Sequence, residues 1–120
     1  MMSIMFKTLW FMRRKPGMSR EEFVAYYENV HCKMGEKALR GLATRYVRRH
    51  LEQIDPGGAQ PVYDVVTEIC FASRELYEQG MSQLRTDEFI EDFMRLFDPG
   101  SVVQYFVDEH ESELALVEAR

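Results

Sequence analysis

Three histidines are the residues of this sequence best suited to acid–base chemistry, and His31 has the most informative surroundings. It follows Tyr27 by four positions, so both side chains fall on one face of a helix, at the edge of an apolar stripe. Burial lowers a histidine pKa and a helix C-terminus raises it, which leaves an imidazole that titrates near neutrality. The pattern allows three roles for His31: a general acid or base, a structural hydrogen bond at the helix end, or a ligand to a metal ion or haem.

The other two histidines lie in segments with strand-like alternation. His50 shares a strand face with Tyr46 and Arg48, a set that could hold an anionic oxygen by charge while the tyrosine positions a ring. A solvated strand of arginines is the alternative. His110 shares a face with Asp108, whose carboxylate could orient the imidazole, and a frayed terminus is the alternative there. All three histidines are therefore candidate catalytic residues.

The remaining ligand types show no metal-site spacing, because neither HExxH nor paired CxxC occurs. Cys32 directly follows His31, and adjacent helical residues point about 100° apart, so the two do not form a nucleophile and base pair. We expect no dedicated metal site, reduced thiols at Cys32 and Cys70, and a buried thiol at Cys32. Reduced thiols fit a cytoplasmic protein.

Two acidic residues, Asp64 and Glu68, fall on one face of a predicted strand. Their Cα atoms would be roughly 13 Å apart, which is too far for two carboxylates that share one proton. A buried carboxylate needs a partner, so we expect ion pairs with arginines of the preceding strand. The candidates are Arg45, Arg48 and Arg49.

Aromatic side chains are abundant, with eight Phe, six Tyr and one Trp. Ordinary core packing accounts for many of them, but several could also form the walls of a site for a flat apolar ligand. The candidate substrate-binding residues are Trp10 (with Phe6 beside it), Tyr26, Tyr27, Met34, Tyr46 and Arg48.

The patterning of the chain indicates which elements position these side chains. Ser19 and Glu22 form a capping box that starts the first helix, and Asp55-Pro56-Gly57-Gly58 separates two strands. The apolar periodicity predicts helices over residues 19–35, 73–84 and 86–97, and strands over residues 4–13, 42–53, 63–71 and 101–109. This βαββαβ order with an extra short helix predicts one α+β domain over residues 1–120, with a ferredoxin-like fold.

The second face of such a sheet is not covered by its own helices. Both residue parities of the first and third strands carry large apolar side chains, so this face also needs cover. A second copy packed sheet to sheet about a two-fold axis is the simplest solution, and we expect a homodimer.

Charge and hydropathy exclude several classes of function. Fifteen Lys and Arg against twenty Asp and Glu give a net charge of −5, which would repel a nucleic-acid backbone. No apolar run is long enough to span a bilayer, and the opening MMSIMFKTLWFMRRK has its positive charges after the apolar stretch, the wrong order for a signal peptide. We expect no nucleic-acid or membrane partner.

Three stretches resemble the EthD family: LWFMRRKPGMSREEFVAYYENVH, YVRRH and VVQYFVDEH. The sequence departs from the family pattern at two places. Tyr27 stands where Trp is common, and residues 32–34 do not continue the His-x-Pro pattern that is often seen there. The resemblance implies a dimeric α+β barrel. That architecture also hosts cofactor-independent monooxygenases, polyketide cyclases, muconolactone isomerases and haem-degrading enzymes.

These observations lead to a cofactor-independent enzyme that acts by acid–base chemistry on a small apolar, aromatic or polyketide-like substrate, as a cyclase, isomerase, dehydratase or decarboxylase. A cofactor-free monooxygenase, and thus an oxidoreductase, is the first alternative. The second is a non-catalytic accessory module that binds a hydrophobic metabolite or haem, and the third is a protein whose dimer surface is its whole function.

Overall fold

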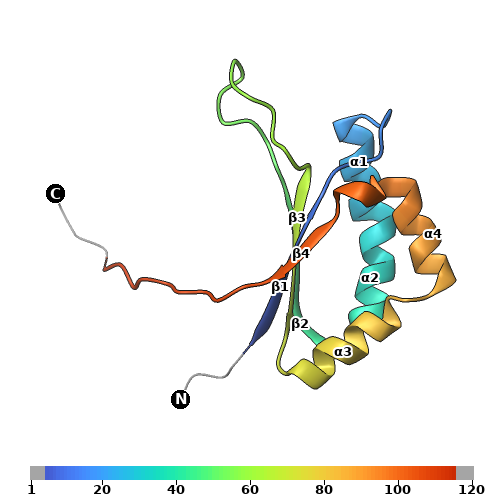
Figure 1. The fold of residues 1–120 in the computed structure, drawn as a ribbon, viewed down its shortest axis with the longest axis vertical. Helices are drawn as coiled ribbons and strands as arrows, with labels where there is room; N and C mark the ends of the chain where they lie inside the picture. The colour runs from blue at the N-terminus through green and yellow to red at the C-terminus, as the bar shows by residue number, and fades with distance from the viewer. Residues whose placement is uncertain (1–4, 116–120) are drawn as a thin grey trace.

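The computed structural model describes residues 5–115. A four-stranded sheet is covered on one face by helices, with the elements in the predicted order (Figure 1). The strands are β1 (Phe6–Met12), β2 (Ala43–His50), β3 (Val65–Phe71) and β4 (Val103–Phe106). The helices are α1 (Arg20–Tyr26), the π-helical turn η1 (Tyr27–His31), α2 (Cys32–Leu39), α3 (Arg74–Gln83), α4 (Asp87–Leu96) and the 3-10 turn η2 (Pro99–Ser101).

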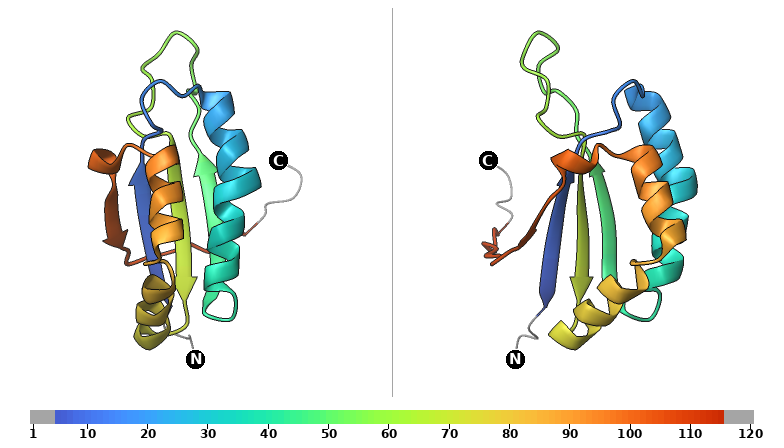
Figure 2. Two further views of the ribbon diagram at one scale, coloured as in Figure 1. Left: turned by 90° about the vertical axis from the view of Figure 1, so that its right-hand side faces the viewer. Right: turned by 45° about the vertical axis from the view of Figure 1, so that its right-hand side comes forward.

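The strands form one antiparallel sheet in the order β2-β3-β1-β4. Helices α1 to α4 lie on one side of it, and the right-hand view in Figure 2 shows that the opposite face carries no helix. This arrangement confirms the predicted α+β, ferredoxin-like fold with an extra helix. Within residues 5–115 no helix is long and apolar enough to cross a membrane.

The first helical segment runs continuously from Arg20 to Leu39 and contains a π turn in its middle. The predicted capping box is present: Ser19 accepts from the Glu22 amide, and the Glu22 carboxylate accepts from the Ser19 amide. The prediction that this helix ends near Gly35 is wrong, because the chain turns away only after Leu39. In the π turn, backbone hydrogen bonds join residues five apart, so side chains with that spacing lie on one face.

Alternation along the strands divides the sheet into a helix-facing side and an open side. The β1–β3 register pairs Thr8 with Ile69 and Trp10 with Thr67, and these residues face the helices. The core beneath them forms two adjoining clusters, one around Phe23 and Phe97 and the other around Phe71 and Leu39. Residues of both clusters, such as Met12 and Leu39, line the cavity described below.

The observed strands are shorter than predicted at their outer ends. β2 stops at His50 and β4 at Phe106, and the predicted first residue of β1, Ile4, lies outside the described residues. Residues 107–115 form no regular element and extend away from the sheet (Figure 1).

Candidate functional site

A cavity of about 320 Å³ lies between the sheet and the helical layer. That volume is at the lower end of the range of ligand pockets, roughly 300–1,000 Å³, and suits a small ring system. Most of its wall is apolar. The lining residues are Trp10, Met12, Tyr27, His31, Gly35, Leu39, Tyr46, Thr67, Ile69, Tyr77, Met81, Leu84, Arg85, Phe89, Ile90, Phe93, Phe97 and Gln104.

His31 lies in the wall of this cavity and is paired with a buried carboxylate. Its Nδ1 is 2.8 Å from Oδ2 of Asp92 on α4, and the two residues are 2% and 3% exposed. Because a carboxylate only accepts, Nδ1 carries the proton and donates it to Asp92. The other nitrogen, Nε2, makes no hydrogen bond to any residue from 5 to 115, and its lone pair is available to a molecule in the cavity.

The π turn brings a second donor to the same carboxylate. Tyr26 and His31 are five residues apart, and the Tyr26 hydroxyl donates to Oδ1 of Asp92 while His31 contacts Oδ2. In an unbroken α-helix a spacing of five would put the two side chains on different faces. Tyr26 therefore binds the carboxylate that holds His31. We had predicted Tyr26 as a wall residue, but it lies outside the cavity lining.

Burial lowers the pKa of His31 from its ordinary value, and Asp92 opposes part of that shift. The raising effect expected from a helix C-terminus is absent, since the helix continues for eight residues beyond His31. A neutral imidazole at pH 7, with its proton on Nδ1, is in the right form to accept a proton at Nε2.

Hydroxyl groups form a second polar region of the wall. The Tyr27 hydroxyl is 2.6 Å from Oγ1 of Thr67, and both residues line the cavity together with Tyr46. Burial raises the pKa of Tyr27 to about 12 and also raises that of Tyr46, so both phenols stay protonated and can donate. The Tyr46 ring lies against Gly35, where an added Cβ would be 2.7 Å from its hydroxyl oxygen.

The strand set predicted around His50 is divided in the structure. Tyr46 lines the cavity, but Arg48 and His50 do not, because both are bound to Glu28 of η1. The Arg48 guanidinium donates to both Glu28 oxygens at 2.8 and 3.2 Å, and His50 Nε2 lies 2.8 Å from one of them. The structure therefore places this group outside the cavity wall, where it holds η1 on β2.

His110, Met34 and Phe6 also lie outside the cavity lining. His110 does pair with Asp108, at 3.2 Å, but its side chain is 85% exposed on the segment after β4. Of the predicted wall residues, the structure brings Trp10, Tyr27 and Tyr46 together with His31.

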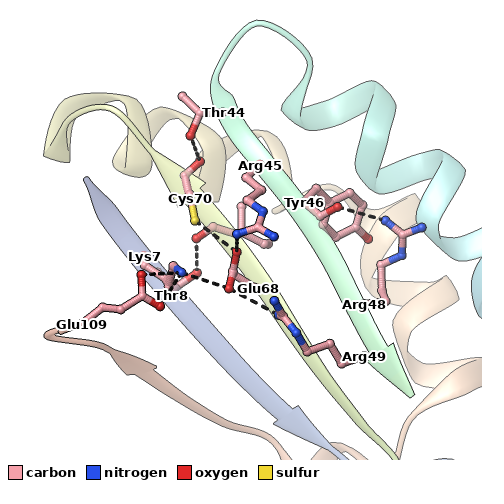
Figure 3. Close-up of polar contacts among 11 residues, drawn as sticks. Lys7, Thr8, Thr44, Arg45, Tyr46, Arg48, Arg49, Glu68, Cys70 and Glu109 are labelled. Carbon is pink, nitrogen blue, oxygen red and sulfur yellow. Dashed lines mark hydrogen bonds and ion pairs between the residues drawn. The ribbon is translucent and has the colours of Figure 1, made fainter. Parts of the chain in front are cut away.

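Some of the predicted ion pairs are present. The largest group of them surrounds Glu68, on the open sheet face. Glu68 is 3% exposed and is bound by Arg45 and Arg49, as predicted, and also by Lys7 of β1, at 3.1–3.3 Å (Figure 3). Burial would raise the pKa of Glu68, but these cations outweigh it and the net shift is downward. Asp64 pairs with Arg14 and not with the β2 arginines, so that part of the prediction is wrong.

Asp92, the hydrogen-bond partner of His31, is the residue of this site that sequence reasoning missed. A signal for it exists: it follows Phe89 by three positions and precedes Leu96 by four, so a charged side chain occupies the buried stripe of α4. A carboxylate at such a position needs a partner.

Cys32 and Cys70 are free thiols, and Cys32 is buried, as predicted; Cys70 is buried as well. No group of three His, Cys, Asp or Glu residues within the described part of the chain is arranged to hold a metal ion.

A family model, the EthD domain, matches residues 15–100 and thus includes both His31 and Asp92. The chain belongs to the EthD family. Solved structures agree with this at the level of fold. An EthD-like protein from Ralstonia eutropha JMP134 has a TM-score of 0.69 at 18% identity, over 89% of this chain and 93% of that one. An ethyl tert-butyl ether d (EthD) family protein from Bacillus halodurans C-125 has a TM-score of 0.64 at 19% identity, over 89% and 100%.

A more distant similarity links the EthD domain to a hydroxynitrile lyase from Passiflora edulis, with a TM-score of 0.50 at 15% identity, over 92% of this chain and 100% of that one. Identities this low show a shared fold and nothing about the reaction. No protein with a curated description matches the chain.

Proposed function

We propose that this EthD domain is an enzyme that removes a proton from a small, largely apolar, aromatic or polyketide-like substrate, with His31 as the general base. The His31–Asp92 pair in the wall of an apolar cavity carries this proposal. A buried carboxylate that fixes the histidine tautomer is the arrangement that directs an imidazole lone pair at a substrate.

The hydroxyl groups of the cavity have a matching role. When a carbon next to a carbonyl loses its proton, negative charge develops on the carbonyl oxygen. Tyr27 and Tyr46 are protonated donors in the same wall, and hydrogen bonds from such donors stabilise that charge in a site with little water. Enolisation of this kind is the common first step of isomerisation, dehydration and ring closure.

This chemistry requires no cofactor, and we propose that the protein uses none. An enzyme that passes the resulting carbanion to molecular oxygen, as a cofactor-free monooxygenase, would use the same base and the same cavity. A non-catalytic module that holds an apolar metabolite or haem is the second candidate, favoured by the apolar lining. The buried free thiols suit a reducing cytoplasm, where we place the protein.

Solvent deuterium exchange tests the base directly, without knowledge of the full reaction. Aryl ketones and aromatic 1,3-dicarbonyl compounds are incubated with the protein in D₂O, and loss of the α-proton signal is followed by NMR. We expect exchange with wild type, loss of exchange in His31→Gln with binding retained, and wild-type exchange in the control His110→Gln. Binding with no exchange in wild type would favour the accessory module.

We also propose that a second copy covers the open sheet face. Leu9, Phe11 and Val47 lie there half-buried, and Tyr105 is 56% exposed. An apolar face that surrounds the paired charges of Glu68 fits a two-fold, sheet-to-sheet contact. Light scattering should give twice the chain mass, and Phe11→Glu should give a folded monomer. A monomeric wild type would refute the dimer.

A further inference from the structure

The charged groups in the cavity wall are unevenly distributed. Among residues 5–115 no Asp or Glu lines it, and apart from His31 the one basic side chain of these residues in the wall is that of Arg85, in the turn between α3 and α4. Asp92, which holds His31, lies behind the wall and is occupied by His31 and Tyr26. A ligand in the cavity therefore meets a positive group and no negative one.

Arg85 lines the cavity from just before the start of α4. The backbone of the N-cap Thr86 is extended, so Arg85 lies outside the helix, while Phe89 and Phe93 line the cavity from within it. Among the lining residues, Arg85, Ile90 and Gln104 are exposed, so Arg85 lies where the cavity meets solvent. Phe97, which is buried, packs against Tyr27 of the hydroxyl region.

Arg85 also has no ion-pair partner among residues 5–115. Most arginines among residues 5–115 form an ion pair with a carboxylate, whereas Arg85 forms none. Asp87 and Glu88 follow it in the first turn of α4, but neither of them lines the cavity. An unpaired guanidinium at the mouth of an apolar cavity can form two parallel hydrogen bonds with a carboxylate.

We propose that the cavity selects aromatic carboxylates, with Arg85 binding the carboxylate at the mouth while the ring enters the apolar part. This inference rests on the proposed function, since it names the class of molecule on which His31 acts. The reacting end then lies by His31 and the hydroxyl groups, and the charged end stays at the solvent-exposed arginine. The net charge of the chain is −5, so Arg85 supplies a local attraction that the surface as a whole does not.

Calorimetric titration with 2-naphthoate and its uncharged analogue 2-naphthamide tests the proposal. We expect wild type to bind the acid about tenfold more tightly, the factor that one exposed charge-assisted contact supplies, and the preference to fall as salt is raised. Arg85→Gln should bind both ligands equally, Arg85→Lys should keep part of the preference, and Arg85→Glu should favour the amide.

The matched control is Arg40→Gln, which removes the same charge from another exposed arginine that lies outside the cavity. It should retain the wild-type preference. Equal binding of acid and amide by wild type, or an unchanged preference in Arg85→Gln, would overturn the role of Arg85 and leave the proposed function standing. Failure of wild type to bind either ligand would overturn both proposals.

Discussion

Replacing Asp92 with asparagine keeps the size of the side chain and removes the charge that fixes His31. The amide oxygen can accept from Tyr26, and the amide nitrogen then faces Nδ1 of His31 as a donor. Nδ1 must become the acceptor, so the proton moves to Nε2, the nitrogen available to the cavity. We expect Asp92→Asn to fold with the histidine in the wrong tautomer for a base.

Two effects set the size of the change. Each hydrogen bond to a charged acceptor is worth about 1.5–3 kcal/mol and each neutral one about 0.5–1.5 kcal/mol, so exchanging two of them lowers the free energy of unfolding by about 2–3 kcal/mol. Loss of the correct tautomer should reduce exchange activity by roughly 10⁴-fold, as in other carboxylate–histidine pairs.

The pH dependence of stability changes in a defined direction. In the folded protein the pKa of His31 is below its ordinary value of 6.5. Below pH 6.5 the unfolded chain therefore binds the proton first, and the free energy of unfolding decreases as the pH is lowered. Asp92 raises that pKa, and its removal lowers it further. The acid-sensitive window of Asp92→Asn therefore extends to lower pH than that of wild type, while stability above pH 6.5 stays flat with respect to this group.

Nitrogen-15 NMR of the imidazole rings reads the tautomer directly, and the three histidine signals are assigned with His31→Gln. Glu91→Gln is the control, since it neutralises an exposed acid on the same helix. A wild-type His31 with its proton on Nε2, or an unchanged tautomer in Asp92→Asn, would refute the reasoning.

Three further substitutions test the surroundings. Tyr27→Phe should lower the free energy of unfolding in urea by about 1–3 kcal/mol, because Thr67 loses its buried partner; an effect as large in a Thr67→Val background would contradict the pairing. Gly35→Ala should destabilise by about 1–2 kcal/mol and weaken ligand binding, since overpacking against Tyr46 exceeds the gain in helix propensity; unchanged binding would argue against that contact. Glu68→Gln should destabilise at pH 7 and by progressively less below about pH 4.5, since its lowered pKa makes the wild-type contribution disappear on acidification; a constant difference between pH 7 and 3 would refute this.

The sequence predicted the architecture because its signals are local. Capping residues such as Ser19 and Thr86 mark helix starts, and both caps are present. Tyr27 and His31 were predicted to share one helix face at the edge of an apolar stripe, and both line the cavity.

The parts of the site that were missed depend on contacts between distant segments. Nothing in residues 27–31 marks a π turn, since the segment has no proline or glycine, and so the convergence of Tyr26 on Asp92 could not be foreseen. Arg48 shares the strand face of Tyr46, as predicted, but the carboxylate of Glu28 binds it and it does not line the cavity. The sequence does not determine which carboxylate pairs with which arginine, because it contains many of both.

The π turn has a consequence for comparing this domain with its relatives. A π turn contains one residue more than the α-helical turn that it replaces. A homologue with a regular helix and the same buried face would therefore be one residue shorter between Phe23 and Leu39. A correct alignment would then contain a single-residue gap inside a helix, where gaps are normally penalised. An alignment without that gap would pair His31 with the neighbour of its true counterpart, and a histidine shared by both proteins would be overlooked.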